Sequence, residues 1–139
     1  KVGHFKDLKV YYFHNCPYGR VFTSPTMLSE YGQPTQWILD NISSEYKVIF
    51  VGDAQMAPYE LMGDYSYSPN RDPNAPKTGL DWLHRFRGKY PNVIWLNPSQ
   101  RPTWGQYWTQ TYDTIAGIFP MFSLTVEGLE DGMKKLLSR

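Results

Sequence analysis

The stretch Val48-Ile-Phe-Val-Gly-Asp53 ("VIFVGD") decides the fold class of this 139-residue chain. An uninterrupted apolar run rich in β-branched residues is typical of a strand that is buried on both faces. A glycine and a carboxylate end the run, as expected where a strand reaches the edge of its sheet. Similar apolar runs occur at Leu8–Phe13 and Asn92–Leu96. We therefore interpret Lys47–Val51 and these two runs as strands of one sheet.

The segments that follow these strands have helical patterns. Pro34–Ser44 carries a proline near its start, and Thr78–Tyr90 places apolar residues at helical spacing. Alternating strands and helices predict an α/β fold with a Rossmann-like, mostly parallel sheet. Thr125–Leu137 predicts a last helix, with Thr125 as its N-cap and lysines near its end. Its expected apolar stripe is Val126, Leu129, Met133 and Leu136.

Composition limits the classes of function. A chain of this length fits a single domain, residues 1–139, with a sizeable core. The net charge of +1, without a run of Lys or Arg, disfavours nucleic acid as a partner. No apolar run has the length of a membrane span, and no signal peptide is visible, so we expect no membrane partner. Cys16 is the lone cysteine, which favours a reducing, cytoplasmic location.

Polar residues follow each predicted strand at the edge where ligands bind in such sheets. They are His14-Asn15-Cys16, Gly52-Asp53 and Asn97-Pro98-Ser99. Asp53 fits three roles: a metal ligand, a general base, or the N-cap of a helix that begins near Gln55. His14 and Cys16 lie two residues apart, so on a strand they would share a face and could form a nucleophile pair. No third group that would orient the histidine is evident, and a lone cysteine is more often a small buried apolar residue.

Four segments together resemble a known family. They are "KVYYFHNCPYGRVF" (9–22), "VIFVGDAQMAPYEL" (48–61), "NVIWLNP" (92–98) and "MFSLTVEGLEDGMKKL" (121–136). The combination is similar to the second half of a von Willebrand factor A domain of the CoxE-like bacterial type. The resemblance implies a Rossmann-like sheet with a metal-ion-dependent adhesion site that holds Mg²⁺. Asp53 matches the third motif of that site and Thr35 the second, and both are oxygen donors, as Mg²⁺ requires.

The chain departs from this family at the first motif, Asp-x-Ser-x-Ser. The family's first strand and helix, which carry this motif, would precede Lys1, so we interpret the chain as a partial domain. Asp64-Tyr-Ser-Tyr-Ser68 matches in letters only, because it follows no apolar strand. In the family's strand order the missing strand lies between the Leu8 and Lys47 strands. Either another chain supplies it or these two strands pair directly, and this chain alone should bind Mg²⁺ weakly or not at all.

The resemblance implies a non-enzymatic interaction module. Such proteins commonly partner MoxR-type AAA+ ATPases in chaperone-like or metal-cofactor-insertion work, with an acidic residue of a client completing the Mg²⁺ shell. Two alternatives stay open: a hydrolase that uses His14 and Cys16 or a metal at Asp53, and a structural fragment without its own active site. An aromatic cluster is best interpreted as core, with a partner-facing patch as the alternative; it comprises Trp104, Tyr107, Trp108 and Tyr112.

Overall fold

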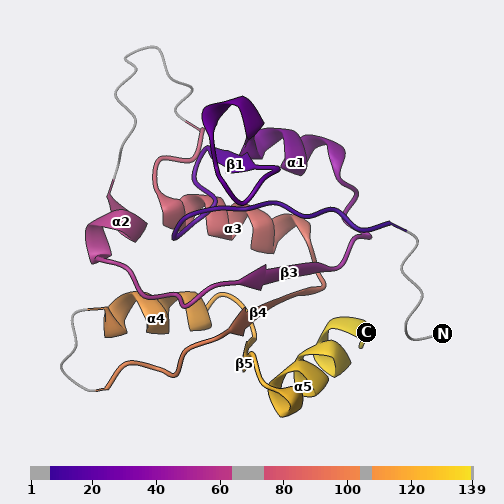
Figure 1. Ribbon diagram of the computed structural model, residues 1–139, viewed down its shortest axis with the longest axis vertical. Helices are drawn as coiled ribbons and strands as arrows, with labels where there is room; N and C mark the ends of the chain where they lie inside the picture. Colours follow the sequence, from indigo (N-terminus) through magenta and orange to yellow (C-terminus); the bar gives the residue numbers. More distant parts are fainter. Residues whose placement is uncertain (1–6, 64–73, 104–107, 139) are drawn as a thin grey trace.

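The computed structural model describes residues 7–63, 74–103 and 108–138. A parallel sheet with the strand order β3-β4-β5 lies at its centre, and β1 and β2 form a separate antiparallel hairpin (Figure 1). The strands are β1 (Arg20–Phe22), β2 (Gly32–Pro34), β3 (Val48–Val51), β4 (Val93–Asn97) and β5 (Met121–Ser123). The α/β, Rossmann-like architecture predicted from the sequence is therefore confirmed.

Helices connect these strands and cover the sheet. They are η1, a 3₁₀ helix (Ser29–Tyr31), α1 (Thr35–Asn41), α2 (Pro58–Met62), α3 (Gly79–Lys89), α4 (Thr109–Ala116) and α5 (Val126–Leu137). The three helices predicted from the sequence correspond to α1, α3 and α5, with shorter ends. The α3 helix begins with a capping box, in which the Thr78 hydroxyl accepts the Asp81 N–H at 3.0 Å and the Asp81 carboxylate accepts the Thr78 N–H at 3.2 Å.

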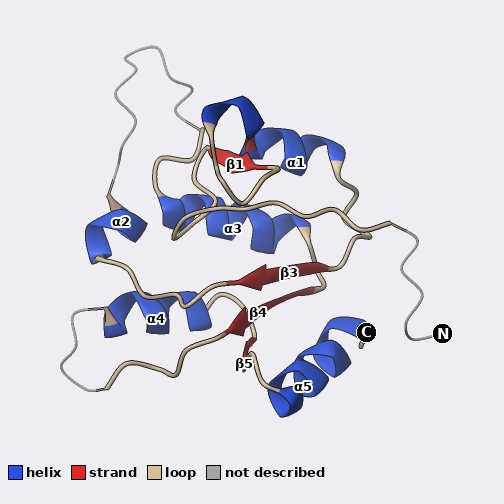
Figure 2. Ribbon diagram, in the orientation of Figure 1, coloured by secondary structure: helices blue, strands red, loops and turns tan. Residues whose placement is uncertain are grey.

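Aromatic side chains fill the core on one face of the sheet. The Phe50 ring of β3 stacks on the Trp95 ring of β4, with 5.3 Å between centroids. Phe50 also meets Phe86 of α3 edge-on at 5.3 Å and Phe119, which follows α4, at 5.1 Å. Figure 2 shows α5 on the opposite side of the sheet from α3. Many of the aromatic residues, which make up 17% of the chain, therefore pack in the core.

The α5 helix packs on the second face of the sheet through glycines, which corrects the predicted apolar stripe. Met133 and Leu136 do pack against the sheet, but Val126 and Leu129 are 77% and 43% exposed. Gly132 instead faces β4: a Cβ atom there would lie 3.1 Å from Ile94 Cδ1. The missing side chain lets the helix approach the strand closely, and this rotates part of the apolar stripe toward solvent.

The segment Leu8–Phe13 does not join the parallel sheet, contrary to the prediction. Tyr12 alone in this segment forms a bridge, antiparallel to Phe22, with N–H···O distances of 2.7 and 2.9 Å in the two directions. Phe13 contacts Phe50 ring to ring, with centroids 6.1 Å apart, but within the described residues no backbone hydrogen bond links the segment to β3. Its hydrogen bonds go to β1, so direct pairing with the Lys47 strand does not occur here.

Several predictions from the sequence fall at or beyond the limits of the described residues. The Asp64–Ser68 stretch lies outside them, as do Trp104 and Tyr107 of the aromatic cluster. The rest of that cluster divides between core and surface, since Tyr112 packs against the core and Trp108 is 41% exposed. Over the ranges that the structure covers, no helix is both long and apolar enough to cross a membrane.

Candidate functional site

The loop after β3 places Asp53 at the carboxyl edge of the sheet, exposed to solvent. Its Oδ1 accepts the Gln55 N–H at 2.9 Å, which closes a short turn. The α2 helix begins only at Pro58 and has Ala57 at its N-cap position, so Asp53 does not cap it. The N-cap role considered from the sequence is therefore replaced by a turn-closing role that uses one carboxylate oxygen.

Two buried polar side chains hold this loop in place through hydrogen bonds to its backbone. Asn97, at the end of β4, is 2% exposed and donates its amide to the Asp53 carbonyl at 2.9 Å. The Thr111 hydroxyl of α4 accepts the Met56 N–H at 3.2 Å. Between these anchors Ala54 has φ = 58°, in the left-handed region that non-glycine residues rarely adopt. A rigid frame thus holds a strained turn at the sheet edge, as is common at functional sites.

Thr35, the second predicted metal ligand, lies in a different environment. It is the first residue of α1, is completely buried, and its hydroxyl donates to the Pro17 carbonyl at 3.3 Å. Across the described ranges no group of three or more His, Cys, Asp or Glu side chains could hold a metal ion. Asp53 therefore offers a carboxylate to solvent, whereas Thr35 does not face solvent, and these two residues alone do not fit a Mg²⁺ site. The assignment of both as ligands stays a prediction.

His14 and Cys16 do not share a face, contrary to the expectation for residues two apart on a strand. The Cys16 N–H donates to the His14 carbonyl at 2.7 Å around Asn15, whose φ is 63°. This γ-turn leaves His14 exposed and directs the Cys16 thiol inward, 3.8 Å from the Met56 sulfur. Burial, with a smaller contribution from the nearby Glu60 charge, raises the pKa of the Cys16 thiol to about 12. The thiol is therefore protonated at neutral pH, which disfavours it as a nucleophile.

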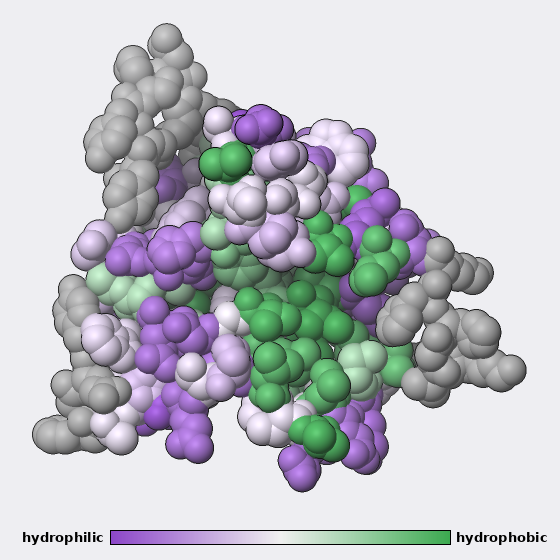
Figure 3. All heavy atoms as spheres, viewed as in Figure 1, coloured by the Kyte–Doolittle hydropathy of each residue, from purple (hydrophilic) through white to green (hydrophobic). Residues whose placement is uncertain are grey.

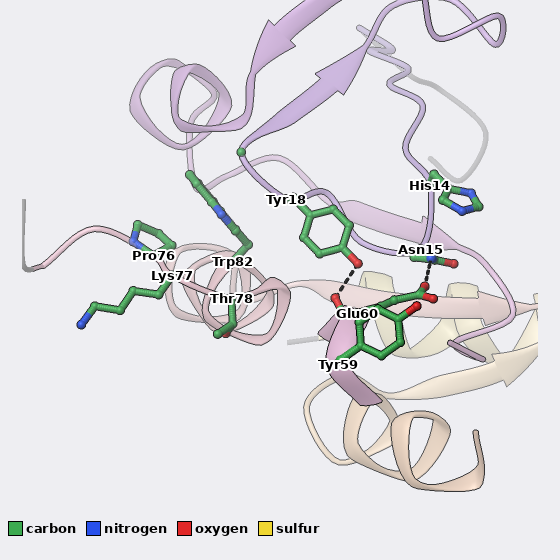
Figure 4. Close-up of a pocket in the computed structure, with 10 residues that line it drawn as sticks. His14, Asn15, Tyr18, Tyr59, Glu60, Pro76, Lys77, Thr78 and Trp82 are labelled. Atoms are coloured by element: carbon green, nitrogen blue, oxygen red, sulfur yellow. Dashed lines mark hydrogen bonds between the residues drawn. The ribbon is translucent and has the colours of Figure 1, made fainter. Parts of the chain in front are cut away.

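The same γ-turn forms one side of a cavity of about 680 Å³. Figure 4 shows Glu60 of α2 beside Asn15, with the Tyr18 and Trp82 rings on the other side. Asn15 donates its side-chain amide to the Glu60 carboxylate, and the Tyr18 hydroxyl donates to the Glu60 carbonyl. No pattern in the sequence predicts this site, because its residues come from separate segments and form no spaced motif.

The outer edge of β3 is open. The N–H groups of Val48 and Gly52 donate toward β4, to the carbonyls of Asn92 and Leu96 at 2.9 and 3.2 Å. Backbone groups alternate in direction along a strand, so those of the residues between, Ile49 and Val51, point away from β4. No strand of the described chain pairs with that side.

An apolar face accompanies this edge. The side chains of Ile49 and Val51 are 42% and 52% exposed, and Leu129 of α5 is 43% exposed. Figure 3 shows apolar residues gathered where β3, β4 and α5 lie in Figure 1. Surface of this kind, next to an unpaired strand edge, is typical of sites that bind another polypeptide.

Comparisons of the chain with protein-family models, curated proteins and solved structures found no match. The similarity to CoxE-like von Willebrand factor A domains accordingly rests on the quoted segments and stays a prediction.

Proposed function

We propose that this chain is a protein-interaction module whose sheet is extended by a strand from a partner polypeptide. The open edge of β3 is the observation that supports this most directly. Ile49 and Val51 direct backbone donors and acceptors to that edge and expose apolar side chains beside them. An extended peptide satisfies both, because its backbone pairs with the edge while its side chains cover the apolar face.

The segment 8–13, which lies next to the open edge of β3, also supports this proposal. This segment runs alongside β3 (Figure 1). Just before the segment, Asp7 accepts a hydrogen bond from the Tyr46 hydroxyl at 2.5 Å, and at the end of the segment the Phe13 ring contacts the Phe50 ring. Tyr12 directs its backbone groups to Phe22, so its neighbours direct theirs to the opposite side. Leu8 and Val10 add exposed apolar surface, at 76% and 53%. An added strand gains backbone partners and apolar contacts in this region.

The resemblance to CoxE-like proteins gives the proposal a more specific form. The partner is a MoxR-type AAA+ ATPase together with a client protein, and the work is chaperone-like or concerns insertion of a metal cofactor. Asp53 would hold Mg²⁺, and an acidic side chain of the partner would complete its coordination shell. The ion would link the partner's acidic side chain to the carboxyl edge of the sheet. The buried Cys16 thiol and its raised pKa disfavour the form of the competing hydrolase that uses His14 and Cys16.

A site-specific photo-crosslinker tests the open edge. A benzophenone side chain at Val51 should crosslink to one extended segment of a partner in native cells, whereas the same group at Val126 should not. Val126 is a matched control because it is equally apolar and 77% exposed, but lies on α5. With the purified partner, amide exchange at Ile49 and Val51 should slow. Unchanged exchange at both amides in the presence of a crosslinked partner would refute strand addition.

A further inference from the structure

We propose that the cavity between α2, α3 and the Asn15 turn binds a basic side chain, arginine or lysine, of a protein partner. That the ligand belongs to a protein rests on the function proposed above; its positive charge follows from the cavity itself. Three features support this inference: the floor offers hydrogen-bond acceptors, the walls are aromatic, and a carboxylate lies at the centre.

Acceptors make up the floor. Asn15 donates its amide N–H to Glu60 Oε2, which leaves the Asn15 carbonyl oxygen as an acceptor. Glu60 itself is a carboxylate with two acceptor oxygens, each of which can accept more than one hydrogen bond. The left-handed φ of 63° at Asn15 fixes this arrangement through the γ-turn. A ligand with several N–H donors, such as a guanidinium or ammonium group, fits this floor.

Aromatic rings make up the walls. Tyr18, Tyr59 and Trp82 line the cavity around Glu60 (Figure 4). A cation near such rings is attracted by the negative charge on their faces. Lys77 belongs to the rim, but its side chain extends away from Glu60 in Figure 4, so it does not neutralise the carboxylate.

Charge excludes the other simple ligand classes. An anion would be repelled by the Glu60 carboxylate, and a purely apolar group would remove water from that carboxylate without replacing its hydrogen bonds. The cavity of about 680 Å³ is in the size range of ligand sites and accommodates a long basic side chain. Arginine matches the carboxylate geometry with two parallel N–H groups, so we expect it to bind more tightly than lysine.

The test uses N-acetyl-arginine amide as the probe and N-acetyl-citrulline amide, its neutral isostere, as the control ligand. The indole N–H signal of Trp82 is followed by NMR. We expect a saturable shift with a Kd on the order of 1 mM for the arginine probe, as is typical of so small a ligand. Citrulline should bind about tenfold more weakly or not at all, because it lacks the charge. Equal affinity for both probes, or no saturable shift with arginine, would overturn the proposal.

Variants separate the roles of the carboxylate and the rings. Glu60→Gln keeps an acceptor for Asn15 but removes the charge, and should weaken arginine binding about tenfold. Tyr59→Ala removes a ring that is 61% exposed, so the core stays intact, and should weaken binding about threefold. Glu45→Gln, an exposed residue elsewhere, is the charge-matched control and should change nothing. Undiminished binding by either cavity variant would contradict the assignment. Because the probe needs no added strand, these results are independent of the test at β3.

Discussion

Single residues at the sheet edge carry a local structural task, to which the proposed function adds a role toward partners. Asp53 shows this most clearly, since its Oδ1 closes a turn on the Gln55 N–H while the carboxylate remains exposed. The two tasks depend on different properties: the turn needs an acceptor oxygen, whereas a Mg²⁺ ion needs the negative charge. Two substitutions at the same position therefore distinguish them.

Asp53→Asn should keep the fold at its normal stability and remove magnesium-dependent partner binding, because an amide oxygen still closes the turn. Asp53→Ala should lose the same binding and also cost about 0.5–1.5 kcal/mol, the net value of one hydrogen bond. Paired thermal melts and pull-downs measure both effects. An Asp53→Asn protein that binds its partner normally in the presence of magnesium would contradict the metal assignment.

Cys16 should be unreactive at physiological pH. Burial raises its folded-state pKa from 9.0 to about 12, so the native protein holds the proton that the unfolded chain releases. The stabilisation that comes from this protonated thiol is complete below about pH 9 and is lost as the pH rises toward 12. Iodoacetamide labelling of the native chain should therefore stay slow up to pH 9, and urea should expose the thiol. Fast labelling at pH 7.5 would show that the thiol is accessible.

Replacing this residue tests the same point through stability. Cys16→Ala should leave any partner binding unchanged and lower the free energy of unfolding by about 1–2 kcal/mol, because it removes a small buried group. Denaturant titration gives the cost. Loss of an activity without loss of the fold would instead revive the nucleophile alternative.

At the scale of elements, close approach between helix and sheet depends on glycine. Gly128 lies at the start of α5, where an added Cβ would be 2.0 Å from the Ser123 carbonyl oxygen. Gly132 lies one turn later against Ile94. These positions set how α5 covers β4 and β5, and thereby how much of Ile49 and Val51 in β3 stays uncovered.

Two glycine-to-alanine substitutions should consequently have opposite effects. Gly128→Ala should destabilise the protein by about 1–3 kcal/mol, since the new methyl group must displace backbone. Gly88→Ala, in α3, meets nothing within 4 Å and should stabilise by up to about 1 kcal/mol through helix propensity. Urea unfolding of both variants measures the difference. If the two effects had the same sign, the packing of α5 described here would be wrong.

At the scale of the whole molecule, the parallel sheet ends in an open edge at β3 while the hairpin β1–β2 and the segment 8–13 lie beyond it. Among the described residues, the two sides meet through side chains, such as Phe13 against Phe50, rather than through backbone hydrogen bonds. Under the proposed function, the strand of the partner would add at this edge.

The metal prediction also belongs to this scale. The chain alone should bind Mg²⁺ weakly or not at all, because Asp53 offers one carboxylate and Thr35 is completely buried. Calorimetric titration with MgCl₂ should give no heat that saturates below about 1 mM. A tight site of one ion per chain would refute this, and Asp53→Asn would then show whether the ion binds at the expected place.

The sequence by itself determined the elements that depend on local pattern. Strands β3 and β4 follow from uninterrupted apolar runs, and α3 and α5 begin at the threonines that cap them. Burial on both faces, which the runs also predicted, holds for β4 but is wrong for β3, where Ile49 and Val51 are exposed. The position of Asp53 just past the end of β3 also followed from the sequence. These features need only side-chain periodicity, capping and the rule that polar residues end buried strands.

Only the tertiary structure decided which elements meet. Leu8–Phe13 has the composition of a strand, but its single bridge is to Phe22 and not to β3. The left-handed φ at Asn15 turns the His14 and Cys16 side chains in different directions, and no periodicity in the sequence predicts such a turn. Glu60 joins Asn15 although 45 residues separate them. Contacts of this kind depend on long-range packing, in which many weak interactions compete. A local stretch of sequence therefore does not predict which segments will meet.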